Sequence, residues 1–300
     1  MIDIKIEQPI NILVQRRAAI GDTVMTTGIV RELKRLYGPN AYIDVATDCA
    51  EVYRNNPHIR NIFPVDQIPS VNNKYEHYLN LDLAYEMNPR NHLLDSMFYR
   101  AFGNNTVDRR VELFPSTEDK QVVDRIIMEI DAPFVVVHMR NWHWQAKNIS
   151  MEVWFEVFVK LFETRTDFKI VCVGGASDGF LEEHPNFVDV RDQLNIQQQK
   201  YLCDHARCFV GIDSSPYWAA AASKTHIVSL STLFRNEQVM PFRDRTMGHN
   251  CTPITTLEDC AGCWETLPTP VRQPYCKKGT TPCNNNFDTT AIADAILKTL

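Results

Sequence analysis

The stretch that decides the fold is Asn11–Arg31, NILVQRRAAIGDTVMTTGIVR. It opens with the apolar run Ile12–Val14, which is short and β-branched enough to predict a buried parallel strand. A turn at Gly21 follows, and from Thr23 onward the apolar spacing predicts a helix. In an open α/β sheet, a strand, a glycine turn and a helix N-terminus form the usual position for a ligand. Asp22 lies at this helix start, where an aspartate can also simply cap free backbone N–H groups.

The remainder of the chain alternates short apolar runs with amphipathic segments. Strands are predicted at 42–47, 61–65, 75–82, 134–138, 168–173, 187–190, 208–213 and 226–230, and helices at 50–55, 92–102, 116–130, 151–163, 196–206, 217–223 and 288–300. This alternation predicts α/β architecture with parallel sheets. The proline-containing segment 131–133 divides the pattern into two unequal Rossmann-like halves. We therefore expect domains at 1–131 and 132–250, with a Cys-rich segment and a final helix at 251–300.

Composition restricts the class of protein. Three hundred residues, 44% hydrophobic and 23% charged, suit a soluble chain with two α/β domains. No apolar run approaches the length of a membrane span, and the first residues lack the apolar core of a signal peptide, so we expect a cytoplasmic protein with reduced cysteines. The net charge of −6 argues against a broad nucleic-acid surface.

The segment Arg16–Thr27, together with Ile43–Val45 and Asn56–Ile59, resembles the ADP-heptose:lipopolysaccharide heptosyltransferases, glycosyltransferase family 9. The resemblance implies a GT-B arrangement, in which two Rossmann-like domains face each other. It also implies transfer of a sugar, with inversion, from a nucleotide-diphosphate donor of the ADP type to a hydroxyl acceptor. In this family the aspartate of the turn, here Asp22, is the proposed general base, and the turn residues Arg16 and Gly21 are expected beside the donor.

A second motif, Asp213–Ala221, reads D-S-S-P-Y-W-A-A-A. It resembles the family element D-S-G-P-x-H-x-A-A-A, in which backbone N–H groups and small hydroxyls receive the diphosphate. The resemblance assigns this contact to Asp213, Ser214 and Ser215. Ser215 departs from the usual glycine of the element, and Trp218 stands where the family often has histidine.

The loop after the strand at 134–138 carries Lys147, shortly before Trp154. In the family a lysine at this place contacts the donor's phosphates, with Arg140 and His143 of the same loop as weaker candidates here. A departing diphosphate needs positive charge, and the chain shows no carboxylate pair suited to Mg²⁺, so no catalytic divalent metal is expected.

Gly174 and Gly175 resemble the family's G-G turn near the nucleotide. Any turn that leads from a strand to a helix can use glycine, so the motif alone is weak. Either Asp178 or Glu182 could hold the ribose hydroxyls, and the sequence does not choose between them.

Cysteine spacing provides the last signal. Cys260, Cys263, Cys276 and Cys283 are suited to a tetrahedral thiolate site for structural Zn or Fe, with Cys251 as a spare ligand. The segment is rich in Pro, Gly, Asn and Thr and can build little core, so a metal would supply stability. Related family members carry cysteine clusters near the C-terminus, some of them metal-bound. Free thiols are the alternative, and the final helix is expected to pack back on the first domain.

The sequence therefore predicts an inverting glycosyltransferase of the heptosyltransferase type, acting on a glycan or another hydroxyl acceptor. One alternative is a same-fold transferase acting on a modified DNA base or a protein. A Lys/Arg-lined cleft around Arg90, Arg100, Arg109 and Arg110 would favour nucleic acid. Another is a non-catalytic nucleotide-sugar-binding module, which would not need Asp22. A dinucleotide-dependent dehydrogenase is disfavoured because no G-x-G-x-x-G follows the first strand.

Overall fold

The computed structural model describes residues 8–181, 184–267 and 276–300. Its first sheet contains four parallel strands in the order β3-β2-β1-β4. Their bounds are β1 Ile10–Gln15, β2 Ala41–Ala46, β3 Asn61–Phe63 and β4 His77–Asn80. The strand predicted at 75–82 is thus shortened at both ends.

Helix α1 (Ile20–Tyr37) covers the first sheet and begins three residues before the predicted start. Gly28 lets this helix approach the chain closely, because a Cβ there would lie 2.3 Å from the carbonyl oxygen of Arg110. The other helical elements here are η1 (Ala50–Tyr53), η2 (Val65–Gln67), α2 (Ile68–Val71), η3 (Asn72–Lys74) and α3 (Leu93–Phe102). The side chain of His92 caps α3 by accepting from the Leu94 N–H.

The second sheet contains six parallel strands in the order β12-β9-β8-β5-β6-β7. The strands are β5 Phe134–Val137, β6 Lys169–Cys172, β7 Phe187–Asp189, β8 Cys208–Ile212, β9 His226–Ser231 and β12 Cys251–Thr255. The helices of this part are α4 (Thr117–Ile130), α5 (Met151–Thr164), α6 (Ile196–His205), α7 (Ser215–Ala221), α8 (Asn236–Val239) and α9 (Thr289–Leu297), with short turns η4 (Gln145–Lys147), η5 (Cys263–Thr266) and η6 (Pro282–Asn284). β10 (Phe242–Arg243) and β11 (Thr246–Met247) form a separate hairpin.

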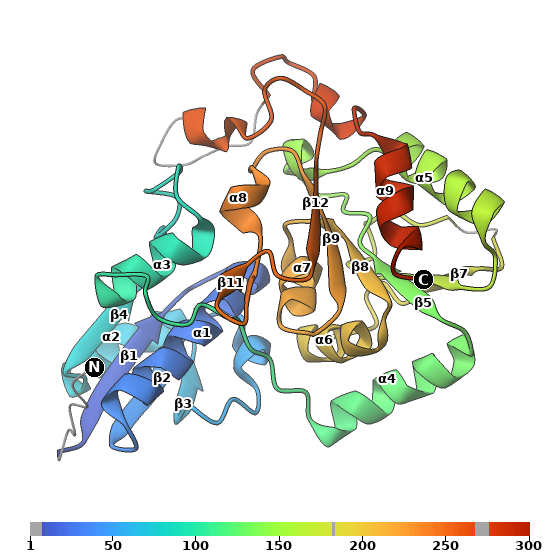
Figure 1. The fold of residues 1–300 in the computed structure, drawn as a ribbon. Coiled ribbons are helices and arrows are strands. Elements are labelled where there is room, and N and C mark those ends of the chain that lie inside the picture. Colours follow the sequence, from blue (N-terminus) through green and yellow to red (C-terminus); the bar gives the residue numbers. More distant parts are fainter. Residues whose placement is uncertain (1–7, 182–183, 268–275) are drawn as a thin grey trace.

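The C-terminal stretch completes the second sheet. β12 is its edge strand, where Pro253 is tolerated because no strand among the described residues pairs on the far side. Ile292 and Ile296 of α9 are buried in the same apolar cluster as Val157 and Leu161 of α5, and the two helices lie side by side (Figure 1). The expectation that the final helix packs on the first domain is therefore wrong, because its apolar face matches that of α5.

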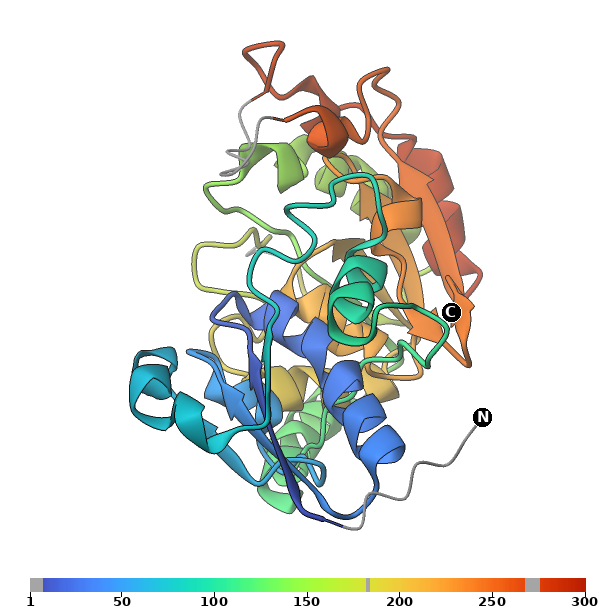
Figure 2. The same ribbon diagram turned by 90° about the vertical axis from the view of Figure 1, so that its left-hand side faces the viewer.

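The two sheets meet through α1 and α7, which pack against each other at the centre of the molecule (Figures 1 and 2). One continuous cluster of buried apolar side chains runs across this junction. Polar contacts reinforce it: the Gln197 amide donates to the carbonyl oxygens of Glu51 and Val52 at 3.1 and 2.9 Å, and the His92 ring is bonded to the Met240 carbonyl at 2.8 Å. The predicted α/β class with two Rossmann-like sheets is confirmed. Within the described ranges, no helix has the length and apolar character needed to cross a bilayer.

Candidate active site

Asp22 lies in the first turn of α1, just beyond the carboxyl end of β1. Its Oδ2 is 2.6 Å from Nη2 of Arg16 and also accepts from the Ala19 N–H at 3.2 Å, while Oδ1 accepts from the Tyr85 hydroxyl at 3.2 Å. The side chain remains about one-fifth exposed, at 21%. Asp22 therefore caps its helix and also presents a fixed carboxylate to solvent, so the two interpretations are compatible.

Arg16 is almost completely buried and is held from several sides. It pairs with Glu86 at 3.1 Å, donates to the Leu81 carbonyl at 3.0 Å, and lies over the Tyr85 ring. Burial by itself would lower the pKa of Arg16, but Asp22, Tyr85 and Glu86 outweigh it and raise the pKa. Arg16 is thus a permanent cation whose bonds fix Asp22 in place.

The two sequence motifs meet at Gly21. A Cβ at this position would lie 3.1 Å from Cδ1 of Trp218 and 3.4 Å from the backbone nitrogen of Ser215. The turn that carries Asp22 therefore abuts the start of α7, although almost two hundred residues separate the motifs in the sequence. Only glycine allows this approach without displacing a neighbour.

Asp213 and Lys147 form a buried ion pair at the carboxyl edge of the second sheet. Lys147 Nζ is 2.6 Å from Asp213 Oδ2, and the indole N–H of Trp218 donates to Asp213 Oδ1 at 2.8 Å. The rings of Trp144 and Phe234 flank the ammonium group at 5.6 and 5.3 Å. The tryptophan that departs from the family pattern thus serves as a hydrogen-bond donor to this aspartate.

Arg140 supplies a second positive charge in the same loop. Its Nη1 donates to the Trp144 carbonyl at 3.1 Å and to Asn148 Oδ1 at 2.6 Å. Burial lowers the pKa of Arg140, and the charges of Asp213 and Asp178 partly offset that effect. Among the described residues no carboxylate forms an ion pair with it, which favours this weaker candidate as an anion ligand.

The G-G turn after β6 encloses a carboxylate. Gly174 has φ +127°, and a Cβ there would lie 2.3 Å from Oδ2 of Asp178, so glycine is required. Asp178 accepts from the backbone N–H groups of Gly175 and Asn141 at 2.8 and 2.7 Å. Its oxygens are therefore engaged by the chain itself. Glu182, the other candidate for the ribose, lies outside the described residues.

His138 belongs to this edge of the sheet, although no sequence motif marks it. Its Nε2 lies 3.0 Å from Asp178 Oδ2, and its Nδ1 lies 2.9 Å from the hydroxyl of Ser214. The available signal was its position, since it directly follows the buried strand β5. Carboxyl ends of parallel strands are where ligand-binding side chains gather.

The four candidate metal-ligating cysteines gather beyond the end of β12. Cys283 is buried, and burial together with the charges of Cys276, Cys260 and Cys263 raises its pKa to about 12. The four sulfurs thus lie within electrostatic range of one another. Among the described residues, however, these four sulfurs do not lie close enough together to share one ion.

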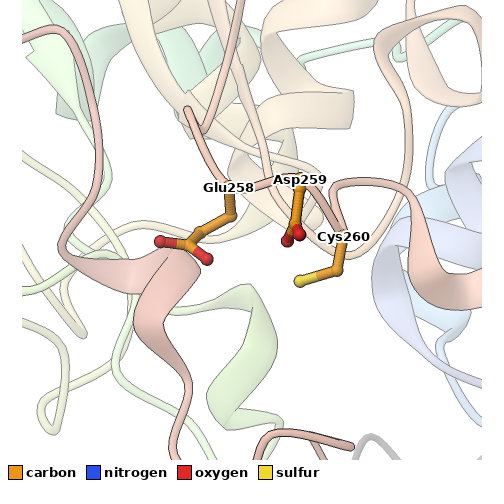
Figure 3. Close-up of side chains that lie close together, drawn as sticks. All are labelled: Glu258, Asp259 and Cys260. Atoms are coloured by element: carbon orange, nitrogen blue, oxygen red, sulfur yellow. The ribbon is translucent and has the colours of Figure 1, made fainter.

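The described residues contain one tighter group of potential ligands, formed by Glu258, Asp259 and Cys260 (Figure 3). Lys278 Nζ lies 2.9 Å from Glu258 Oε2 and 2.7 Å from Asp259 Oδ1. The ammonium of Lys278 thus already pairs with both carboxylates and occupies the place that a metal ion would take between them. The cysteines are the better donor set for Zn or Fe, because soft thiolates suit both ions.

The two facing parallel sheets, joined through α1 and α7, have the fold of the GT-B glycosyltransferases of family 9. No family model matches the sequence, and no curated protein matches it. The likeness to solved structures nevertheless extends over nearly the whole chain.

A family 9 glycosyltransferase from Veillonella parvula shares 14% identity at a TM-score of 0.72, with 98% of each chain covered. ADP-heptose lipopolysaccharide heptosyltransferase II of E. coli shares 14% identity at a TM-score of 0.71, covering 97% of this chain and 98% of its own. The iron-containing dodecameric glycosyltransferase TibC of enterotoxigenic E. coli shares 17% identity at a TM-score of 0.71. The match covers 99% of this chain and 80% of the TibC chain.

Proposed function

We propose that this chain is an inverting glycosyltransferase that moves a heptose-type sugar from a nucleotide-diphosphate donor to a hydroxyl acceptor. The observation that carries the proposal is the contact of the Gly21–Asp22 turn with Ser215 and Trp218. It brings a fixed carboxylate of the first sheet against the motif of the second sheet that resembles the family's donor element. A module that only bound nucleotide sugars would not need that carboxylate.

In the proposed reaction, Asp22 takes the proton of the acceptor hydroxyl as its oxygen attacks the anomeric carbon. The bond from that carbon to the diphosphate breaks on the opposite face, which inverts the anomeric configuration. Arg16 and Tyr85 orient the carboxylate through their bonds at 2.6 and 3.2 Å. Lys147 and Arg140 stabilise the charge that develops on the departing diphosphate.

The donor is proposed to be ADP-linked. Two related structures contain such ligands: TibC in complex with ADP-D-beta-D-heptose, and the E. coli heptosyltransferase WaaC with ADP. In this chain the phosphates would lie against the start of α7 at Ser214 and Ser215, beside the Lys147–Asp213 pair, with the nucleoside toward Gly174 and Gly175. No catalytic divalent ion is part of the proposal, because these cationic side chains supply the charge that the leaving group needs.

ADP should raise the melting temperature of the protein, whereas adenosine at the same concentration should raise it far less. A ligand that binds only the folded state, present at a hundred times its Kd, adds about 2.7 kcal/mol to the free energy of unfolding. Differential scanning fluorimetry with a panel of nucleosides and nucleoside diphosphates makes the comparison. A protein that no nucleoside diphosphate stabilises would contradict the proposed donor class.

Two of the arginines that would favour a nucleic-acid acceptor are already neutralised. Arg109 forms an ion pair with Asp95 and stacks on the Phe242 ring at 3.7 Å, and Arg110 pairs with Asp108 at 2.7 Å. Phosphate binding depends on cations that are free to release counterions. A glycan acceptor is therefore favoured over DNA.

We further propose that Cys260, Cys263, Cys276 and Cys283 bind one structural Zn or Fe ion, which would draw the four sulfurs together. The bound ion would cross-link a segment that has little core of its own. TibC is described as iron-containing, which supports the same interpretation.

Elemental analysis of protein purified without chelator should find close to one Zn or Fe per chain, and Cys263→Ser should lower that content. Cys49→Ser provides the matched control, because Cys49 lies in the first half of the chain, far in sequence from the cluster. Metal-free protein whose C-terminal thiols all react promptly under native conditions would exclude the site.

A further inference from the structure

Asp178, His138 and Ser214 form a hydrogen-bonded chain at the carboxyl edge of the second sheet. The two links measure 3.0 and 2.9 Å, and only 4% of His138 is exposed. The anchor of the chain is rigid, because Asp178 also accepts two backbone N–H bonds at 2.8 and 2.7 Å. Burial would raise the pKa of Asp178, but His138 and these N–H groups outweigh it and lower the pKa.

An ionised Asp178 fixes which hydrogen each group carries. A carboxylate only accepts hydrogen bonds, so Nε2 of His138 carries a hydrogen. In the neutral imidazole, Nδ1 is then an acceptor, and the Ser214 hydroxyl donates its hydrogen bond to Nδ1. In the imidazolium form, Nδ1 donates instead, and the Ser214 hydroxyl is free to donate elsewhere.

The Ser214 hydroxyl is well placed to act on the donor. It follows Asp213, the partner of Lys147, and precedes Ser215, which abuts the turn that carries Asp22. Although Ser214 is the N-cap residue of α7, its side chain makes no capping bond, and the hydroxyl instead bonds to His138.

Other charged groups surround the chain. Arg140 of the β5–α5 loop and Arg191 after β7 both interact electrostatically with Asp178, and the buried pair of Lys147 with Asp213 lies beside Ser214. Arginine, lysine and aspartate side chains ordinarily keep their charge across neutral pH, whereas imidazole is the side chain whose charge ordinarily changes there.

We infer that binding of a sugar-nucleotide diphosphate is coupled to uptake of one proton by His138, which turns the Ser214 hydroxyl from the imidazole to the phosphate. This inference rests on the proposed function. A diphosphate offers only acceptors, so it selects the state in which Ser214 donates. The proton comes from solvent and adds to Nδ1, and no covalent bond of the ligand changes.

The sign of the pH dependence follows from linkage. A ligand that takes up a proton binds more tightly as pH falls. The affinity should therefore fall with rising pH, by up to about tenfold per pH unit over the range in which the proton is taken up. ADP-heptose is the suitable probe, because its diphosphate is esterified at both ends and has no group that titrates near neutral pH.

Isothermal titration calorimetry with ADP-heptose between pH 6 and 9, in two buffers of different ionisation enthalpy, measures both the affinity and the number of protons taken up. Wild-type protein should bind ADP-heptose less tightly as pH rises and should take up one proton on binding. His138→Gln and Ser214→Ala should each bind with an affinity that is independent of pH. Ser214→Ala retains the hydrogen bond between His138 and Asp178. It therefore still tests the inference if the His138→Gln variant does not fold.

His226→Gln is the matched control, since His226 lies in the same sheet and its ring nitrogens bond to Asn250 and Thr252. It should retain the linkage of the wild type. Wild-type binding that does not vary with pH, or linkage that persists in Ser214→Ala, would overturn the inference while leaving the proposed donor intact. Absence of ADP-heptose binding at every pH would overturn the proposed function and this inference together.

Discussion

Replacing Asp22 by asparagine should lower the rate of sugar transfer by about a hundredfold or more, the usual scale for loss of a general base. Asparagine retains the size of the side chain and can still accept from Tyr85, but it does not take the acceptor's proton. Binding of ADP-heptose should be unchanged, because the donor side of the site remains intact. Initial rates of ADP release in the presence of a glycan acceptor, together with calorimetric affinity, check both parts.

Glu86→Gln is the matched control for this substitution. Glu86 is the second carboxylate on Arg16, at 3.1 Å, against 2.6 Å for Asp22. If loss of a negative charge beside Arg16 were what impaired the enzyme, the two variants would be equally slow. A base role for Asp22 requires that Glu86→Gln remain much faster, and a near-normal rate in Asp22→Asn would remove Asp22 from the mechanism.

Replacing Lys147 by methionine should lower the free energy of unfolding by about 3–5 kcal/mol, because it leaves a buried aspartate without its cation. Lys147 and Asp213 have side chains that are only 11% and 8% exposed. The variant should also lose most of its affinity for ADP-heptose while retaining that for adenosine, since lysine acts on phosphate through charge. Urea denaturation and calorimetry measure the two effects.

A double variant separates these effects. Lys147→Met combined with Asp213→Asn should regain most of the lost stability, because no unpaired charge remains buried, but it should not regain ADP-heptose binding. Lys200→Met, which breaks a more exposed pair with Asp204, should cost about 0.5 kcal/mol or less. A double variant that is as unstable as Lys147→Met would contradict the role of the buried pair. If Lys147→Met lost affinity for ADP-heptose and for adenosine equally, Lys147 would lie away from the phosphates.

Local sequence patterns predicted most of the architecture because each element carries its own signal. Ser116 and Ser150 both cap their helices, α4 and α5, through hydroxyls that accept from backbone N–H groups. The strand β12 escaped detection because its sequence, CTPIT, contains a proline and alternates weakly. Only the neighbouring strand β9 makes this stretch part of the sheet.

The residues of the candidate site could be proposed from the sequence, but the partner of each residue could not. Asp22, Lys147 and Asp213 were identified from motifs, but the bonds of Lys147 to Asp213 and of Arg16 to Asp22 depend on which loops meet at a sheet edge. His138 carries no motif, and its hydrogen-bond partners Asp178 and Ser214 are 40 and 76 residues away in the sequence. Long-range pairing of this kind leaves no periodic trace in the sequence.

The position of β12 and α9 in the chain has a consequence for synthesis. The first sheet has all of its strands once residue 80 has emerged, so its part of the molecule can begin to fold while the ribosome is still at work. The second sheet acquires its edge strand only at residues 251–255, and the apolar face of α5 stays uncovered until α9 follows at 289–297. Until then, β9 offers an open edge of the kind that pairs with other chains. The nascent chain is therefore most exposed to misassembly until residues 251–297 have been made, the stretch that also carries the cysteine cluster.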